Sequence, residues 1–143
     1  MLCLYGFRGL GYSPGFIRNM TGILRAIEGD PERRVEIAAA PDEICHACPH
    51  LQDGKCGKGG PESEARVHRQ DERVLRRLRM EVGKVLPARL AFSRVEQGIS
   101  PEDLPELCQE CQWLSLGYCR EGLRAGRISA TSDWQVHFRS AGL

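Results

Sequence analysis

The sequence predicts a mainly α-helical domain with a small β element, folded compactly around two cysteine loops. Three observations lead to this fold class. Apolar residues recur at helical spacing in several long segments, only two short segments alternate as a strand does, and the pattern Cys-x2-Cys-x7-Cys occurs twice. The chain has 143 residues, of which 41% are hydrophobic. This length suits one ordinary domain, so we expect a single domain over residues 1–143.

The first helix is expected over residues 14–28. Ser13 is a good N-cap and Pro14 suits the first helical position. Apolar residues then follow at helical spacing: Phe16, Met20, Ile23, Leu24 and Ile27. Gly29-Asp30-Pro31 ends the helix. Val35-Glu36-Ile37 alternates briefly and predicts a short strand.

The longest helical pattern covers residues 62–82. Its apolar side is formed by Val67, Val74, Leu75, Leu78 and Val82. Another side carries five arginines: Arg66, Arg69, Arg73, Arg76 and Arg77. A break near Gly83 and Pro87 precedes a shorter helix, which contains Leu90, Ala91 and Val95.

The last predicted helix begins at Ser100-Pro101-Glu102-Asp103. A capping serine, a proline at the first helical position and acids in the first turn are together typical of a helix start. This helix should run into the second cysteine loop. In the tail, Trp134, Val136 and Phe138 alternate and predict a strand or a packing strip.

The repeated cysteine motif carries the functional information. Residues 45–56, here called loop 1, and residues 108–119, here called loop 2, both follow the pattern Cys-x2-Cys-x2-Leu-x2-Gly-x-Cys. Gly54 and Gly117 precede the third cysteine of each loop by two residues, where the returning chain requires a positive φ. Leu51 and Leu114 should face inward and keep water from the site. The domain therefore contains an internal repeat.

The seven cysteines are predicted to be metal ligands. The chain has no apolar run long enough to span a membrane, and its N-terminus has no signal-peptide core, so we expect it in the cytoplasm, where thiols stay reduced. An odd number of cysteines also disfavours a disulfide framework. The predicted ligands are Cys3, Cys45, Cys48, Cys56, Cys108, Cys111 and Cys119.

Each loop supplies three thiols and needs a fourth ligand. Cys3 can complete one set. The other set must use a histidine or another oxygen or nitrogen ligand, or leave the position open. His50 is the foremost histidine candidate, and His46 and His137 are the others.

The spacing favours iron–sulfur clusters over zinc. Zinc sites commonly pair two two-ligand knuckles, whereas each loop here combines Cys-x2-Cys with one more distant thiol. The loops resemble the cluster-binding segments of iron–sulfur helicases and of related cluster-containing nucleases, in which a remote cysteine joins a compact group. Pro49 after Cys48 also suits a cluster. We expect one or two four-iron clusters, with zinc as the alternative cofactor.

Three functions are compatible with these ligands. The leading one is electron transfer or redox sensing with a redox partner protein. The second is a zinc-stabilised module that docks a partner or nucleic acid through the arginine side of the 62–82 helix, although a net charge of +1 gives no overall attraction to nucleic acid. The third is an enzyme that binds substrate at an open cluster iron. No nucleophile–base pair can be identified in the sequence, which favours a non-enzymatic role.

Three segments together resemble a known family. They are the stretch from Cys3 to Met20 (CLYGFRGLGYSPGFIRNM), the stretch beginning Pro41-Asp-Glu-Ile-Cys45, and loop 2. The sequence is similar to the bacterial and archaeal family called domain of unknown function twelve-eighty-four, over nearly the whole chain to about residue 124. Members usually begin Arg-Pro-His-His-Leu-Leu-Cys, whereas this chain begins Met1-Leu2-Cys3 and lacks the histidine pair. The resemblance implies iron–sulfur or metal binding and no particular reaction.

Overall fold

The computed structural model describes residues 1–126, and this part of the chain is mainly helical with a small β component, as the sequence predicts. The α-helices are α1 (Pro14–Gly29), α2 (Ser63–Leu78), α3 (Ala88–Gly98), α4 (Leu104–Leu107) and α5 (Tyr118–Ala125). Short 3-10 helices are η1 (Leu2–Leu4), η2 (Cys45–Ala47), η3 (Pro101–Asp103) and η4 (Leu114–Leu116). The strands are β1 (Arg34–Glu36), β2 (Leu51–Gln52), β3 (Lys55–Cys56) and β4 (Val85–Pro87).

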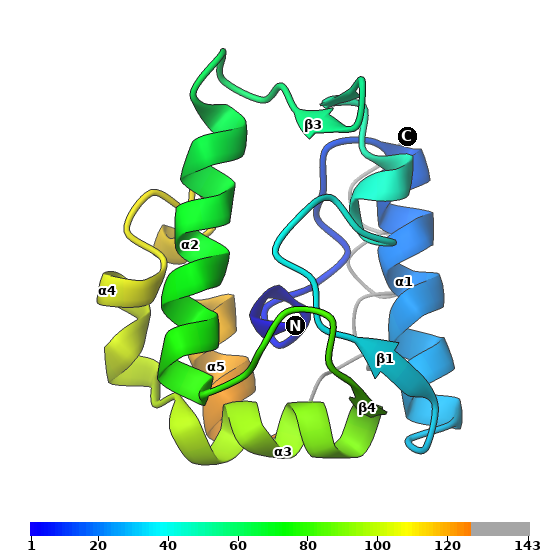
Figure 1. Cartoon of the computed structure of the whole chain (residues 1–143), viewed down its shortest axis with the longest axis vertical. Helices are drawn as coiled ribbons and strands as arrows, with labels where there is room; N and C mark the ends of the chain where they lie inside the picture. The colour runs from blue at the N-terminus through cyan, green and yellow to red at the C-terminus, as the bar shows by residue number, and fades with distance from the viewer. Residues whose placement is uncertain (127–143) are drawn as a thin grey trace, which may run out of the picture.

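The helices surround the N-terminal segment. α1 and α2 lie on opposite sides of the molecule, α3 crosses one end, and the first residues lie between them (Figure 1). Leu2, Leu4 and Tyr5 are accordingly buried in the core, and Tyr5 is 0% exposed. The Tyr5 hydroxyl donates to the Phe92 carbonyl at 3.3 Å and to Glu96 Oε1 at 3.2 Å. These bonds satisfy the polar end of a buried tyrosine and tie the N-terminus to α3.

The predicted start of α1 is confirmed. The side chain of Ser13 accepts a hydrogen bond from the Phe16 N–H at 3.1 Å, and Pro14 is the first helical residue. The buried side of α1 consists of Phe16, Met20, Leu24 and Ile27. The helix therefore forms for the expected reasons, namely a good cap and an apolar stripe that the core covers.

α2 is shorter than the predicted helix over 62–82. It ends at Leu78 because Arg79 adopts a left-handed conformation with φ 51°, and the Met80 N–H bonds back to the Leu75 carbonyl. Val82 was predicted to lie on the apolar side of this helix, and that is wrong. It lies beyond the helix end and is 63% exposed. The helical spacing of apolar residues extends to Val82 by chance, although the backbone leaves the helix at Arg79.

A small antiparallel sheet joins the two halves of the chain. β1 pairs with β4 with Val35 opposite Leu86, so the strand predicted at 35–37 forms one residue earlier. Ile37 still bonds to the next turn, because its N–H donates to the Lys84 carbonyl at 2.9 Å. The partner strand β4 was not predicted. A three-residue strand has almost no local signal and is fixed by its distant partner.

The predicted helix start at Ser100 is confirmed, but the helical segment is short. It consists of η3 followed by α4, and it ends at Cys108, where loop 2 begins. α3 also forms as expected, with Ala91 and Val95 fully buried. The predicted strip at Trp134, Val136 and Phe138 lies outside the described residues.

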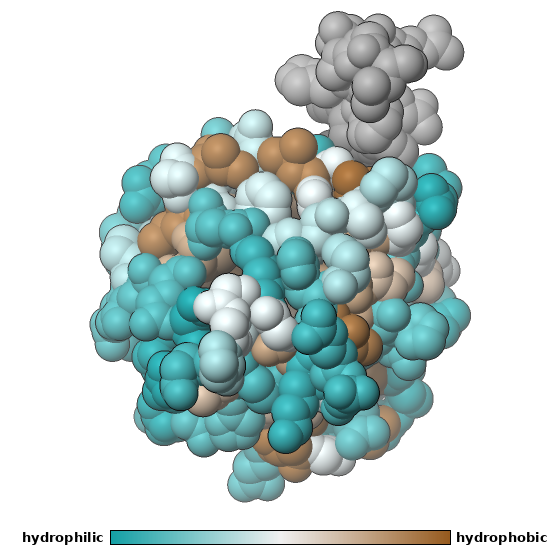
Figure 2. All heavy atoms as spheres, turned by 90° about the horizontal axis from the view of Figure 1, so that it is seen from above, coloured by the Kyte–Doolittle hydropathy of each residue, from teal (hydrophilic) through white to brown (hydrophobic). Residues whose placement is uncertain are grey.

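The described surface gives no sign of a membrane-spanning helix. None of the helices in residues 1–126 is both long and apolar enough to cross a bilayer. Seen from the end that carries β3, the surface is mostly hydrophilic, and its hydrophobic residues lie in separate small patches (Figure 2).

We predict that Ser100→Ala destabilises the fold by about 1 kcal/mol, the usual value of a lost cap. Both the N–H and the hydroxyl of Ser100 donate to Asp103 Oδ2, at 2.7 and 2.9 Å. Urea unfolding measures the effect, and Ser115→Ala, at an exposed residue of η4, is the control. Equal midpoints for the two variants would contradict the prediction.

These hydrogen bonds, with help from Arg77, also lower the pKa of Asp103. The carboxylate therefore contributes stability that is present above the ordinary aspartate pKa and is lost as the pH falls through the lowered value. Ser100→Ala should accordingly reduce the loss of stability on acidification, which urea unfolding at several acidic pH values measures.

Candidate metal centre

The two cysteine loops begin with the same backbone turn. In loop 1, the N–H of Cys48 donates to the Cys45 carbonyl at 2.9 Å, and that of Leu51 to the Cys48 carbonyl at 3.1 Å. In loop 2, the corresponding bonds of Cys111 and Leu114 measure 3.0 and 3.1 Å. The first half of the repeated sequence therefore folds twice into the same backbone turn.

The loops diverge at the third cysteine. Loop 1 continues as a hairpin in which β2 pairs with β3 and Leu51 lies opposite Cys56. Loop 2 instead forms η4 and enters α5, so that Cys119 lies in the first turn of a helix. Gly54 and Gly117 have φ values of 74° and 76°, which confirms the predicted positive φ at both positions. Leu51 and Leu114 are half-buried, and Leu114 packs against the core.

The seven thiols form two groups. The thiol of Cys45 lies close enough to those of Cys48 and Cys56 for their charges to interact, and we call these three residues the loop 1 set. Cys3 interacts in the same way with Cys111 and Cys119, and Cys108 with all three. We call Cys3, Cys108, Cys111 and Cys119 the loop 2 set. The remote cysteine thus belongs with loop 2, a pairing that the sequence left open.

Two glycines allow the N-terminal segment to reach loop 2. A Cβ atom on Gly6 would overlap the Sγ and backbone of Cys119, and a Cβ atom on Gly122 would overlap the carbonyl of Tyr5. η1 and α5 therefore approach at backbone distance, which only residues without a side chain permit. This contact brings Cys3 to Cys119.

Burial makes the thiols poor nucleophiles. Loss of solvent is the largest cause that raises the pKa of Cys45 to about 11 and that of Cys108 to about 12, and neighbouring thiols raise both further. The pKa of Cys3 is raised for the same reason, although this residue keeps an exposed surface. A reactive cysteine has a lowered pKa. Metal ligation also needs the thiolate, so a metal that bound here would have to displace these protons.

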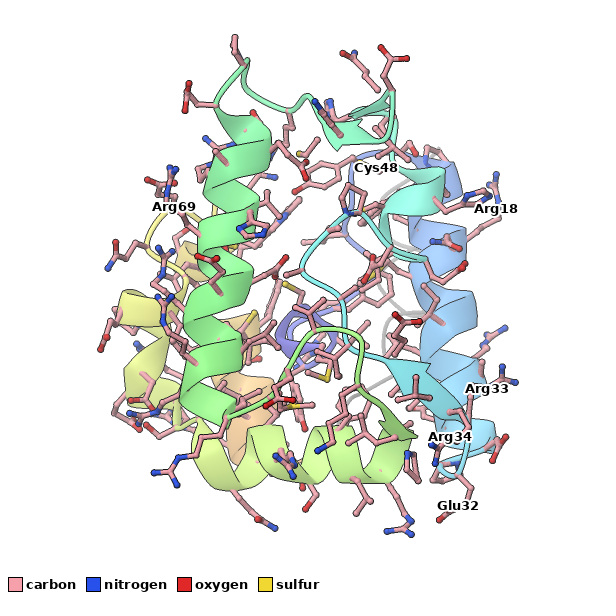
Figure 3. All side chains as sticks on the ribbon, in the orientation of Figure 1. Arg18, Glu32, Arg33, Arg34, Cys48 and Arg69 are labelled. Atoms are coloured by element: carbon pink, nitrogen blue, oxygen red, sulfur yellow. The ribbon has the colours of Figure 1, made fainter. Side chains whose placement is uncertain are left out.

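Different polar groups surround the two sets. In loop 1, Asp42 Oδ1 accepts from the Ile44 N–H at 2.9 Å, and Glu64 Oε2 accepts from the Cys56 N–H at 2.6 Å. In the loop 2 set, the amide of Gln70 donates to Cys108 Sγ at 3.8 Å. Figure 3 shows Cys48 where the chain leaves η2, between α1 and α2. α2 thus contributes contacts to both loops.

Tyr12 connects the two loops. Its ring lies 5.3 Å from that of His50 in loop 1 and 5.7 Å from that of Trp113 in loop 2. The Tyr12 hydroxyl accepts from Trp113 Nε1 at 3.2 Å and from Lys58 Nζ at 3.4 Å, and Lys58 also donates to Gln112. The loops are therefore docked to each other through an aromatic side chain that neither of them contains.

The thiol sets are more open than a site for a single ion. Within residues 1–126, no three His, Cys, Asp or Glu side chains meet closely enough to hold one metal ion as they stand. Ligands of one zinc ion lie about 3.8 Å apart, which is the edge of a tetrahedron with 2.3 Å bonds. Loading either set with a single ion therefore requires its loop to tighten. His46 is exposed, and His137 lies outside the described residues.

Most of the arginines on α2 bond within the chain. Arg66 donates to the Lys58 carbonyl at 3.1 Å and pairs with Glu110 at 3.7 Å. Arg77 pairs with Asp103 at 2.8 Å, and Arg73 donates to the Leu107 carbonyl at 3.4 Å. These contacts tie α2 to loop 2 and to the segment before it. Arg69 is labelled beside α2 in Figure 3.

Several residues of this centre carried no signal in the sequence. Four of these residues contact partners that are far away in the sequence, so no motif or periodicity identifies them: Tyr12, Gln70, Gly6 and Gly122. Asp71 was also missed. It is a half-buried carboxylate on α2 whose pKa burial raises to about 6. These positions can be identified only when the contacts between residues distant in the sequence are known.

We predict that Gly122→Ala destabilises the protein by at least about 2 kcal/mol, because the new methyl group overlaps the Tyr5 carbonyl in a packed region. Gly22→Ala is the matched control, since a Cβ there meets no atom within 4 Å and alanine favours the helix. Urea unfolding compares the two. A Gly122→Ala protein as stable as Gly22→Ala would contradict the close approach of η1 and α5.

One family model matches the chain. The family is described as "Protein of unknown function (DUF1284)", and its model matches residues 11–117. The match is narrower than the resemblance read from the sequence, and Cys3 and Cys119 lie outside it. No curated protein and no solved structure matches the chain.

Proposed function

This chain belongs to the DUF1284 family, and we propose that it is an iron–sulfur protein that transfers electrons or senses redox state. The loop 1 set and the loop 2 set would each hold one cluster, and four-iron clusters suit the spacing of the loops. A cluster supplies a one-electron redox centre. The protein's own residues orient the thiols, exclude water and adjust the charge around them.

One observation carries the proposal. Cys3 lies more than a hundred residues from loop 2 in the sequence, yet the fold places it with Cys108, Cys111 and Cys119. Burial raises the pKa of Cys3, Cys108 and Cys119, and the four thiols of this set come from two distant segments of the chain. A four-iron cluster is bound by four cysteine thiolates, which is the number that this set supplies.

Zinc ligation remains the second candidate cofactor, because four thiols also suit a structural zinc ion. The two proposals differ in colour and composition. An iron–sulfur protein is brown and contains acid-labile sulfide, whereas a zinc protein is colourless and contains none.

We predict that protein purified without oxygen contains about eight iron and eight sulfide ions per chain, the content of two four-iron clusters. Metal and sulfide analysis, together with the visible spectrum, measures this. Stoichiometric zinc without sulfide would support the zinc module instead. A folded protein that contains no metal at all would contradict both.

We further predict that Cys111→Ser loses about half of the iron and lowers the melting temperature, because ligation and folding are coupled. The control is Gln109→Ser, which changes an exposed residue between two ligands of the same loop. Full iron content in Cys111→Ser would remove this residue from the ligands.

Gln70 should adjust the reduction potential of the loop 2 cluster. Hydrogen bonds to cluster ligands stabilise the more negative, reduced state. A bond worth about 1 kcal/mol corresponds to about 40 mV for one electron. We therefore expect Gln70→Leu to lower the potential of one cluster by tens of millivolts, as measured by a potentiometric titration. Gln97→Leu changes an exposed residue of α3 and should leave both potentials unchanged.

A further inference from the structure

The two thiol sets differ in the number of cysteines. Cys3 belongs to the loop 2 set, because the N-terminal segment packs against α5 at Gly6 and Gly122, and this set therefore contains four thiols. The sequence contains seven cysteines, so the loop 1 set contains three. Each iron of a four-iron cluster binds one ligand from outside the cluster. A cluster in loop 1 would therefore have one iron without a cysteine ligand.

Two carboxylates beside loop 1, those of Asp42 and Glu64, are already engaged. Asp42 accepts from two backbone N–H groups of its own turn, those of Ile44 and Cys45, at 2.9 and 3.4 Å. Glu64 accepts from the N–H of Cys56, one of the ligands. If either carboxylate turned toward iron, the backbone bonds that shape loop 1 would be lost.

His50, one of the two histidines of loop 1, is also held elsewhere. The ring of His50 lies edge-on against the ring of Tyr12, with the centroids 5.3 Å apart and an angle of 79° between the rings. Tyr12 is in turn fixed by Trp113 and Lys58. His50 therefore serves as part of the contact between the loops, and moving it onto iron would undo that contact.

We propose that the loop 1 centre is open and binds a small exogenous Lewis base, through an oxygen or nitrogen atom, at the iron that lacks a cysteine. The loop 2 centre is closed by its fourth thiolate. This inference rests on the proposed function, because it requires clusters in both sets. In this proposal, the loop 1 centre binds the ligand, and the loop 2 centre only stores an electron.

An open centre has a chemical signature. One-electron oxidation of a four-iron cluster leaves three ferric ions and one ferrous ion, and the iron without a thiolate then leaves as Fe²⁺. A three-iron cluster remains, which has its own EPR signal. In a closed centre, every iron is held by a cysteine, so the same treatment releases much less iron.

The first experiment measures iron release from the fully loaded protein during mild ferricyanide oxidation without oxygen. We expect about one Fe²⁺ per chain and the EPR signal of one three-iron cluster, because one cluster of two is open. Cys3→Ser removes the fourth thiolate of loop 2, and its iron release should double. Release of no iron, or of two ions, from the wild-type protein would overturn the proposal, and so would a folded Cys3→Ser protein that releases no more than wild type.

A second experiment needs no variant, and it decides the question if Cys3→Ser does not fold. Mössbauer spectra of the ⁵⁷Fe-loaded wild-type protein are recorded with and without imidazole as the probe ligand. We expect about one iron in eight to change its spectrum. A spectrum that imidazole does not alter would overturn the proposal.

Side-chain ligands are tested with Asp42→Asn and His50→Ala. Both variants should show the wild-type response to imidazole. A variant that gains an imidazole response absent from the wild type would identify that side chain as the fourth ligand and overturn the open site. These outcomes differ from failure of the proposed function, in which the protein contains no iron or sulfide at all.

Discussion

The close contact between the N-terminal segment and α5 is the interaction on which the loop 2 set depends. Gly6 and Gly122 leave no room for a side chain at this contact, so the backbone of residues 3–6 lies directly against the first turns of α5. Tyr5 anchors the same segment to α3 through its buried hydroxyl. Without this packing, Cys3 would lie far from the thiols of loop 2. The fold thus gathers four thiols by bringing together the two ends of the described chain.

A second constraint is the docking of the two loops through Tyr12. The loops are similar in sequence, but they make no symmetric contact with each other. Tyr12, which precedes α1, lies between His50 and Trp113, and the ammonium group of Lys58 lies 4.5 Å from the centroid of its ring. The tyrosine hydroxyl accepts a hydrogen bond from Trp113 of loop 2, and its ring packs against His50 of loop 1, so a displacement of one loop is transmitted to the other. Two centres built on these loops would be held at a fixed separation.

α2 is the common support of both loops. Glu64 on this helix fixes the backbone at Cys56, and Gln70 on the same helix reaches Cys108. The arginines that the sequence presents as a stripe for a partner mostly tie α2 to loop 2 and its neighbours. Exposed ion pairs such as that of Arg66 with Glu110 add at most about 1 kcal/mol each. Their main effect here is to fix the orientation of the helix.

The sequence by itself determined α1, α3 and most of α2, the repeated turn and the left-handed glycines, because each of these depends on neighbours within a few residues. Ser13 and Pro14 start α1, and Gly54 and Gly117 have the φ that the return of each loop requires. The tertiary structure alone decided the strand β4 and the membership of Cys3 in the loop 2 set. These features depend on contacts between residues that are far apart in the chain, and neither periodicity nor motif spacing contains that information.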